Sequence, residues 1–202
     1  MMVFDIHVPP VAAPTPLCEL FAKHGSDKGT GRHNYGLYYD ALLSPHRSAV
    51  RRVFELGVFQ GASLRAWRDY FPHARIFGAD IDPLSRVRED RIETFVCDET
   101  LGPDLDALFS QQPLTAAPFD VVLDDALHTP EANAFFLERC FEQILSPGGV
   151  WIIEDLLEPE AYWPLIARWR RELPIDDVRV MRLPPPHPET TDNALCVLRR
   201  RS

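Results

Sequence analysis

The sequence lacks the features that would place it in a membrane or on nucleic acid. No apolar run approaches the roughly 20 residues of a membrane span, and several prolines interrupt an N-terminal stretch that carries no early positive charge, unlike a secretory signal. The 30 acidic residues outnumber the 21 basic ones, giving a net charge of −9, whereas duplex binding needs a concentrated basic face. The dense basic run Arg199–Arg201 is expected to be a solvated tail. We therefore expect a cytoplasmic protein with neither a membrane nor a nucleic-acid partner.

Cysteine is scarce and shows no metal-binding spacing. None of Cys18, Cys97, Cys140 and Cys196 lies in a CxxC motif or near a histidine at zinc-finger spacing. These side chains are expected to be buried in a reducing compartment. A chain of 202 residues buries enough surface to fold as one unit without disulfides or a structural metal.

Apolar patterns alternate between strand and helix along most of the chain. The predicted strands are 53–56, 75–79, 92–97, 119–123, 150–153, 178–183 and 194–198. The predicted helices are 17–23, one beginning in 33–39, 62–71, one around 135–145 that Ser146–Gly149 stops, and 162–172. This order predicts an α/β fold with a mainly parallel sheet, helices on both faces and a C-terminal antiparallel hairpin.

Such sheets bind ligands beyond the carboxyl ends of their strands. The first predicted strand ends in Glu55-Leu-Gly57, with Gly61 opening the next helix, a spacing that is neither GxGxxG nor a phosphate-binding P-loop. An acid in this turn would repel a pyrophosphate but suits a cationic ligand such as S-adenosylmethionine. Asp80 ends the second strand, where a carboxylate accepts hydrogen bonds from ribose hydroxyls, and Asp98 ends the third, where it would face adenine. The turn geometry alone would also explain both glycines.

Acidic residues follow the next two predicted strands. Asp124 and Asp125 end one strand, with His128 three residues further on, and Glu154 and Asp155 end the other. If the two strands are neighbours, these carboxylates lie close together and raise one another's pKa unless a cation neutralises them. Oxygen ligands favour a hard ion such as Mg²⁺, Ca²⁺ or Mn²⁺. His128 is a suitable general base, although helix capping and surface charge also place such residues at strand ends.

Five segments in order give the chain a family resemblance. It resembles the metal-dependent sugar O-methyltransferases of antibiotic biosynthesis, such as the macrocin and mycinamicin O-methyltransferases, and shares much of its pattern with cephalosporin-hydroxylase-like proteins. The matching segments are Gly25-Ser-Asp-Lys-Gly29 with His33 and Tyr35, Phe54–Ser63, Phe77–Asp82, Phe119–His128 and Pro147–Leu156.

The resemblance implies a Rossmann-like class I methyltransferase fold with a role for each motif. It implies an S-adenosylmethionine-dependent O-methyltransferase with Mg²⁺ or Mn²⁺, acting on a sugar or another small natural product, with residues 1–50 as a helical lid and 51–202 as the catalytic domain. It implies His128 as general base and Asp125, Glu154 and Asp155 as metal ligands. The residues that it assigns to the cofactor are Glu55, Gly57, Gly61, Asp80, Asp98 and Asp124. Lys28, His33 and Tyr35 would cover its methionine end or the substrate.

Other functions stay open at this stage. The acceptor atom could be nitrogen, carbon or a carboxylate oxygen, or the fold could serve a non-catalytic binding protein. A hydroxylase is disfavoured because no 2-His-1-carboxylate iron set is evident. The chain has Ala126-Leu127 where the family usually has Gly-Ser, a change expected to reshape the acceptor pocket. Neither the acceptor, the role of the Pro184–Pro188 loop nor the presence of a homo-oligomer follows from the residues.

Overall fold

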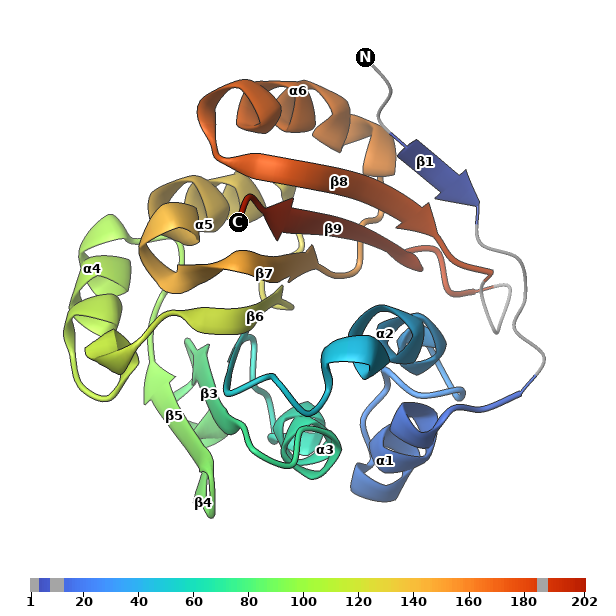
Figure 1. Ribbon diagram of the computed structural model, residues 1–202, viewed down its shortest axis with the longest axis vertical. Helices are drawn as coiled ribbons and strands as arrows, with labels where there is room; N and C mark the ends of the chain where they lie inside the picture. The colour runs from blue at the N-terminus through green and yellow to red at the C-terminus, as the bar shows by residue number, and fades with distance from the viewer. Residues whose placement is uncertain (1–3, 8–12, 185–188) are drawn as a thin grey trace.

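A computed structural model describes residues 4–7, 13–184 and 189–202 of the chain (Figure 1). The strands are β1 Phe4–His7, β2 Arg52–Leu56, β3 Arg75–Asp80, β4 Arg88–Glu89, β5 Ile92–Val96, β6 Phe119–Asp124, β7 Leu145–Ile153, β8 Ile175–Arg182 and β9 Ala194–Arg200. The α-helices are α1 Pro16–His24, α2 Tyr35–Leu43, α3 Ala62–Tyr70, α4 Gly102–Ser110, α5 Pro130–Ile144 and α6 Trp163–Glu172. Short 3-10 turns occupy Ser44–His46, Pro83–Ser85, Leu114–Ala116 and Pro159–Tyr162.

The described strands form one sheet in the order β1-β8-β9-β7-β6-β2-β3-β5-β4. The central strands β5, β3, β2, β6 and β7 pair in parallel, whereas β9 runs antiparallel to both β7 and β8. The strand order changes direction between β2 and β6, which is where ligands bind in open α/β sheets. The predicted α/β fold with its closing antiparallel hairpin is confirmed.

Helices cover both faces of this sheet (Figure 1). One face carries α4, α5 and α6, around a core that includes Phe136, Trp151 and Trp169. The other face carries α1, α2 and α3, around Phe21 and Trp67. Both faces of the central strands are buried, and every residue of β2 is buried, including the charged Arg52 and Glu55.

Helix caps define the ends of two loops that lie at the carboxyl ends of the parallel strands. The Thr129 hydroxyl accepts a hydrogen bond from the Ala132 amide and caps α5, with Pro130 at the first helical position, where no amide donor is needed. Gly25 ends α1 with φ 76°, a left-handed conformation that suits glycine. These two boundaries position the loop after β6 and the glycine-rich loop after α1.

The structure departs from the sequence prediction in two segments. The helix before Ser146–Gly149 ends at Ile144, as predicted, but the following strand β7 begins at Leu145 instead of Val150 and includes this stretch, with a register shift against β6 after Phe119. Arg199 and Arg200 do not form a solvated tail, because both lie in β9 and pair with β7 or β8. β9 pairs with β7 and β8, and this pairing stabilises Arg199 and Arg200 in a strand despite their positive charges.

The residues before β2 share their core with the rest of the sheet. Leu17 and Tyr39 lie in the same buried cluster as Val53 and Trp67, and β1 pairs in parallel with β8 at the edge of the sheet. The lid role of residues 1–50 stays a prediction. Residues 185–188 of the Pro184–Pro188 loop lie outside the described residues.

The four cysteines are free and buried, as expected. Within the described ranges, no helix has the length and apolar character needed to cross a membrane.

Candidate active site

The sheet brings the predicted site residues to one edge. The loops after β2, β6 and β7 are neighbours and exchange backbone hydrogen bonds: the Asp125 amide donates to the Leu56 carbonyl at 2.9 Å, and the Glu154 amide donates to the Asp124 carbonyl at 3.0 Å. The two strands that end in acids are neighbours, since β6 and β7 pair in parallel. The acids at 125, 154 and 155 therefore meet at one rim.

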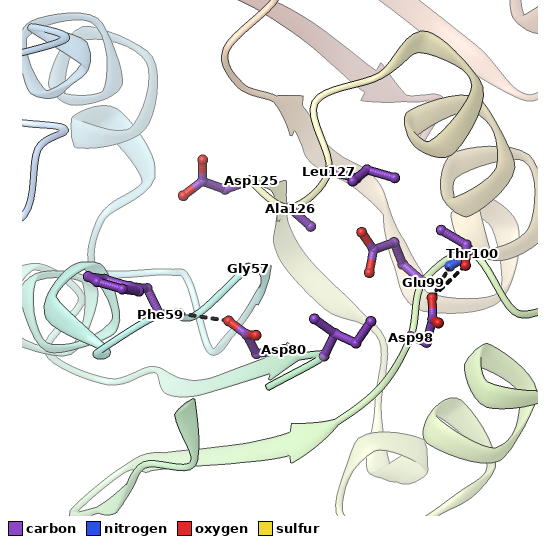
Figure 2. Close-up of a pocket in the computed structure, with 10 residues that line it drawn as sticks. Gly57, Phe59, Asp80, Asp98, Glu99, Thr100, Asp125, Ala126 and Leu127 are labelled. Atoms are coloured by element: carbon purple, nitrogen blue, oxygen red, sulfur yellow. Dashed lines mark hydrogen bonds between the residues drawn. The ribbon is translucent and has the colours of Figure 1, made fainter. Parts of the chain in front are cut away.

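A first cavity of about 330 Å³ lies on the β2–β3–β5 side of this rim. Figure 2 shows Asp80 and Asp98 on one side of it and Asp125 and Leu127 on the other. The lining residues are Gly57, Phe59, Asp80, Ile81, Asp98, Glu99, Thr100, Asp125, Ala126 and Leu127. Leu127, which stands where the family usually has serine, lines this cavity and is half exposed.

The acids of the first cavity are fixed by backbone donors. Asp80 Oδ2 accepts hydrogen bonds from the Val58 and Phe59 amides, both at 2.8 Å, which ties the loop after β2 to the end of β3. Asp98 Oδ1 accepts from the Thr100 amide at 2.9 Å and hydroxyl at 2.6 Å. Both acids keep acceptor capacity on their other oxygen: Asp80 Oδ1 accepts one hydrogen bond, from the Asp82 amide at 2.9 Å, and Asp98 Oδ2 is free of these donors.

Glu99 is a site residue that the sequence reasoning missed. Its side chain lines the first cavity although the residue is buried, and burial followed by the charges of Asp98 and Asp80 raises its pKa. Its place directly after Asp98 in the loop leaving β5 was the available signal.

A second cavity of about 500 Å³ adjoins the first and shares Gly57, Phe59 and Asp125 with it. His128 and Asp155 also line it, together with Lys28 and His33 from the N-terminal segment. One ligand atom each of Asp125, His128 and Asp155 lies within 4.8 Å of the others, a spacing that one cation can bridge. His128 Nε2 is 3.9 Å from Asp155 Oδ2. The predicted general base and two of the three predicted metal ligands thus face the same space.

Three non-glycine residues around these cavities have left-handed backbone conformations. The φ angles are 49° for Phe59, 55° for His128 and 56° for Asp155. Such conformations cost of order 1–3 kcal/mol each and persist where surrounding structure imposes them, commonly at functional sites. These conformations place the Phe59 ring, the His128 imidazole and the Asp155 carboxylate along the second cavity.

The N-terminal segment donates a hydrogen bond to each of the three predicted metal ligands. Lys28 Nζ lies 2.5 Å from Asp125 Oδ2 and 2.6 Å from Glu154 Oε2. The Tyr39 hydroxyl donates to Glu154 Oε1 at 2.6 Å, and the Tyr35 hydroxyl donates to Asp155 Oδ1 at 2.5 Å. Both oxygens of Glu154 are therefore engaged, while Asp125 and Asp155 each keep one oxygen free of these donors.

The charges at the rim do not balance. Burial and the neighbouring acids raise the pKa of Asp125 and Glu154, although Lys28 opposes both shifts. Burial works against the charged form of Lys28, but Asp125, Glu154 and Glu55 outweigh it and hold its pKa well above the ordinary value. One ammonium group therefore compensates the negative charges of Asp125, Glu154 and Asp155 only in part, which favours a further cation at this rim.

Two of the acids assigned to the cofactor lie beneath the cavities. Glu55 is completely buried and accepts hydrogen bonds from the Ser63 hydroxyl and from Trp67 Nε1, and burial raises its pKa to about 7. Asp124 accepts from Asn133 Nδ2 at 3.0 Å, and burial raises its pKa to about 7. Neither lines a cavity described above, so their cofactor roles stay predictions, and the geometry shows them supporting the loops after β2 and β6.

Three other assigned residues lie around the site in different ways. Gly61, with φ 74°, precedes α3 and would bring a Cβ within 2.7 Å of Val87 Cγ2. Tyr35 reaches the rim only through its hydroxyl. His33 is buried, and its Nδ1 lies 3.7 Å from Asp155 Oδ1 and 3.9 Å from Asp192 Oδ1. This Nδ1 atom has no hydrogen-bond partner among the described residues.

Comparison with known proteins identifies relatives of the chain. No protein-family model matches the chain. It is 35% identical over 155 residues to 8-demethyl-8-alpha-L-rhamnosyl tetracenomycin-C 2'-O-methyltransferase of Streptomyces olivaceus, which covers 73% of this chain and 39% of that protein. It is 32% identical over 160 residues to demethylmacrocin O-methyltransferase of Streptomyces fradiae, covering 76% of this chain and 39% of that protein. The chain is related in sequence to these sugar O-methyltransferases. It spans about two fifths of the length of these curated relatives.

Solved structures agree with this relationship. MycE methyltransferase from the mycinamycin biosynthetic pathway, in complex with Mg, SAH and mycinamycin VI, matches with a TM-score of 0.73 and 25% identity, covering 93% of this chain and 55% of that one. The SAH-bound methyltransferase PaMTH1 of Podospora anserina, at 17% identity and a TM-score of 0.59, covers 95% of this chain and 91% of that one and shows the fold alone. The fold is the Rossmann-like class I methyltransferase fold.

Proposed function

We propose that the chain transfers a methyl group from S-adenosylmethionine to a hydroxyl of a sugar on a small natural product, assisted by a divalent cation. The observation that carries this function is the convergence of Asp125, His128 and Asp155 within 4.8 Å, at the border of two adjoining cavities. The family relatives named above methylate hydroxyls of sugars, which supports the choice of acceptor.

The first cavity suits the adenosyl part of the cofactor. Asp80 and Asp98 present carboxylates at the ends of β3 and β5, where ribose and adenine donors are bound in this type of sheet. The glycine at position 57 lets the backbone approach a ligand closely. Glu99 adds a buried carboxyl group beside Asp98, and the exposed Phe59 ring stands at the border of the second cavity.

The rim suits a hard divalent cation. Asp125 and Asp155 supply carboxylate oxygens, with His128 at their side and Glu154 behind them, a largely oxygen set that Mg²⁺ or Mn²⁺ prefers. When all are ionised, the three acids and Lys28 carry a formal charge of −2, which one divalent cation neutralises. When bound, such a cation lowers the pKa of a hydroxyl that reaches it.

The remaining chemistry belongs to the protein's own side chains. The second cavity holds the acceptor hydroxyl near His128, which takes its proton, a contribution of about 10²–10⁴ in rate. Asp155, 3.9 Å from His128 Nε2, stabilises the imidazolium that results. Alignment of the acceptor oxygen with the methyl group supplies a further large share of the rate acceleration, since effective molarities of oriented groups correspond to about 7–11 kcal/mol of the activation barrier.

A radiolabelled methyl-transfer assay tests this function. S-adenosylmethionine with a labelled methyl group is incubated with a panel of glycosylated polyketides, a catechol, an amine and a carboxylic acid, with Mg²⁺ or with EDTA. Label on a sugar hydroxyl that depends on Mg²⁺ supports the proposal. Label on the amine or acid that is unaffected by EDTA would contradict it, and binding of S-adenosylhomocysteine without transfer to any acceptor would favour a non-catalytic role.

A further inference from the structure

Lys28 occupies an unusual position for a lysine. The chain has only two lysines, Lys23 and Lys28, and lysine side chains are almost never fully buried unless they are paired. The Lys23 side chain is 62% exposed, whereas that of Lys28 is 3% exposed. Its ammonium lies between Asp125 and Glu154, at 2.5 and 2.6 Å from their oxygens. It stands where a cation shared by these two acids would stand.

Close backbone packing holds Lys28 in this place. The Lys28 carbonyl accepts a hydrogen bond from the Gly36 amide at 2.9 Å. A Cβ at Gly36 would lie 2.9 Å from Cys18 Sγ, and a Cβ at Gly29 would lie 3.3 Å from Phe21 Cβ. The glycine-rich loop thus lies tightly against α1, which directs the lysine side chain toward the acids that follow β6 and β7.

We propose that Lys28 is an internal counter-cation and a positioning residue for the divalent-cation site. It holds Asp125 and Glu154 together when no metal is bound, and the incoming cation competes with its ammonium for the same carboxylates. The inference rests on the proposed function, because it requires a divalent cation at this rim. It also gives Lys28 a role other than the cofactor contact that the family resemblance implies.

The direction of the effect follows from the contacts on the other side of the acids. Tyr39 holds Oε1 of Glu154 and Tyr35 holds Oδ1 of Asp155, so removal of Lys28 leaves two of the acids anchored. What is lost is a positive charge that repels a divalent cation and occupies two of its candidate ligand atoms. A lysine that merely filled space would leave cation affinity unchanged.

The test compares Lys28→Met with Lys23→Met, its matched surface control. Titration of Mn²⁺ into each protein, followed by electron paramagnetic resonance, gives the cation affinity without any turnover. Lys28→Met is expected to bind Mn²⁺ about tenfold more tightly than the wild type, because a like charge is removed next to the site. Its melting temperature in EDTA is expected to fall by about 10 °C, since one partner of a buried ion pair is gone, and Mg²⁺ is expected to restore most of this loss. Lys23→Met should match the wild type in cation affinity.

A second measurement needs no variant of Lys28. With two lysines, the lysine Cε and Nζ nuclear magnetic resonance signals of the wild type can be assigned through Lys23→Met. Addition of Mg²⁺ is expected to shift the Lys28 signals and leave the Lys23 signals in place.

The outcomes separate this inference from the proposed function. If the wild type binds Mn²⁺ but Lys28→Met binds it within twofold and the Lys28 signals do not move, the counter-cation role is wrong and the metal site stands. If the wild type binds no divalent cation, the metal-assisted function fails and the inference fails with it.

Discussion

A Cβ placed on Gly57 would lie 2.0 Å from the carbonyl oxygen of Asp125. The loop after β2 and the loop after β6 thus touch through their backbones, at the residue that separates the two cavities. Gly57 also has φ 86°, a conformation that other residues rarely adopt. The contact sets the position of Asp125 relative to the first cavity.

Gly57→Ala is expected to push these loops apart. Backbone strain alone should cost about 1–2 kcal/mol of unfolding free energy, and the clash adds to it. We expect S-adenosylhomocysteine affinity to fall by at least about tenfold, or about 1.4 kcal/mol. Calorimetric titration and urea denaturation measure the two effects.

Gly25→Ala is the matched control for this substitution. Gly25 has φ 76°, but a Cβ added there would have no neighbouring atom within 4 Å, so it shares the strain without the clash. Equal loss of stability in both variants, with unchanged affinity in Gly57→Ala, would show that the loop contact has no part in binding.

The variant His128→Ala tests whether His128 acts as a general base or as a metal ligand. Turnover is expected to fall by about 10²–10⁴, while S-adenosylhomocysteine and Mn²⁺ bind as in the wild type. Single-turnover rates and the two titrations check this. Loss of Mn²⁺ binding in His128→Ala would assign His128 to the cation instead, and wild-type turnover would remove it from catalysis.

Adjacent acids provide a test of the metal ligands. Asp125→Asn is expected to weaken Mn²⁺ binding by at least about 100-fold, because outer contacts alone change metal affinity by 10–100-fold. Asp124→Asn, one residue away and held by Asn133, is expected to bind Mn²⁺ normally. The reverse pattern, or activity in the wild type that EDTA does not reduce, would contradict the assignment.

Asp69 makes the N-terminal layer sensitive to acid. Its Oδ2 lies 2.8 Å from Lys23 Nζ and 2.9 Å from His24 Nε2, which joins α1 to α3. Partial burial opposes ionisation, but the hydrogen bonds from Lys23, His24 and Arg68 lower the pKa of Asp69 below its ordinary value. A carboxyl whose pKa is lower in the folded state stabilises the fold above its unfolded pKa near 3.9 and loses this effect as the pH falls below it.

Asp69→Asn is expected to lower the free energy of unfolding by about 1 kcal/mol at pH 7, because the partner lysine is exposed and the pair is screened by solvent. The difference from the wild type should shrink as the pH falls from about 4 to about 2. Denaturation at each pH measures it, with Asp90→Asn, at an exposed side chain, as control. A difference that stays constant across this range would rule out the proposed linkage.

The hydrophobic pattern of the sequence was sufficient to predict the central strands and the position of the site. Residues 53–56 and 119–123 are apolar except for Glu55 and Asp120, so their burial in a parallel sheet follows from composition, and the carboxyl ends of parallel strands meet at one edge. The closeness of Asp125 to Asp155 therefore follows from chain order once the strands are paired.

The contacts of Lys28 could not be read in the same way. It is 97 residues from Asp125 and 126 from Glu154, and its direction depends on how Gly29 and Gly36 pack against α1. β1 was missed because four edge residues carry no periodic signal and gain their structure only by pairing with β8. Helix α4 was missed although Leu105, Leu108 and Phe109 have helical spacing and are buried.

The most direct test of the whole account is calorimetric titration of S-adenosylhomocysteine into the protein, with Mg²⁺ and again with EDTA, with NAD as the control ligand. The account predicts a dissociation constant on the order of micromolar, about −8 kcal/mol, and no heat from NAD. Absence of binding in both buffers, with the protein shown to be folded, would contradict the assignment of the cavity beside Gly57 and Asp80 to the cofactor.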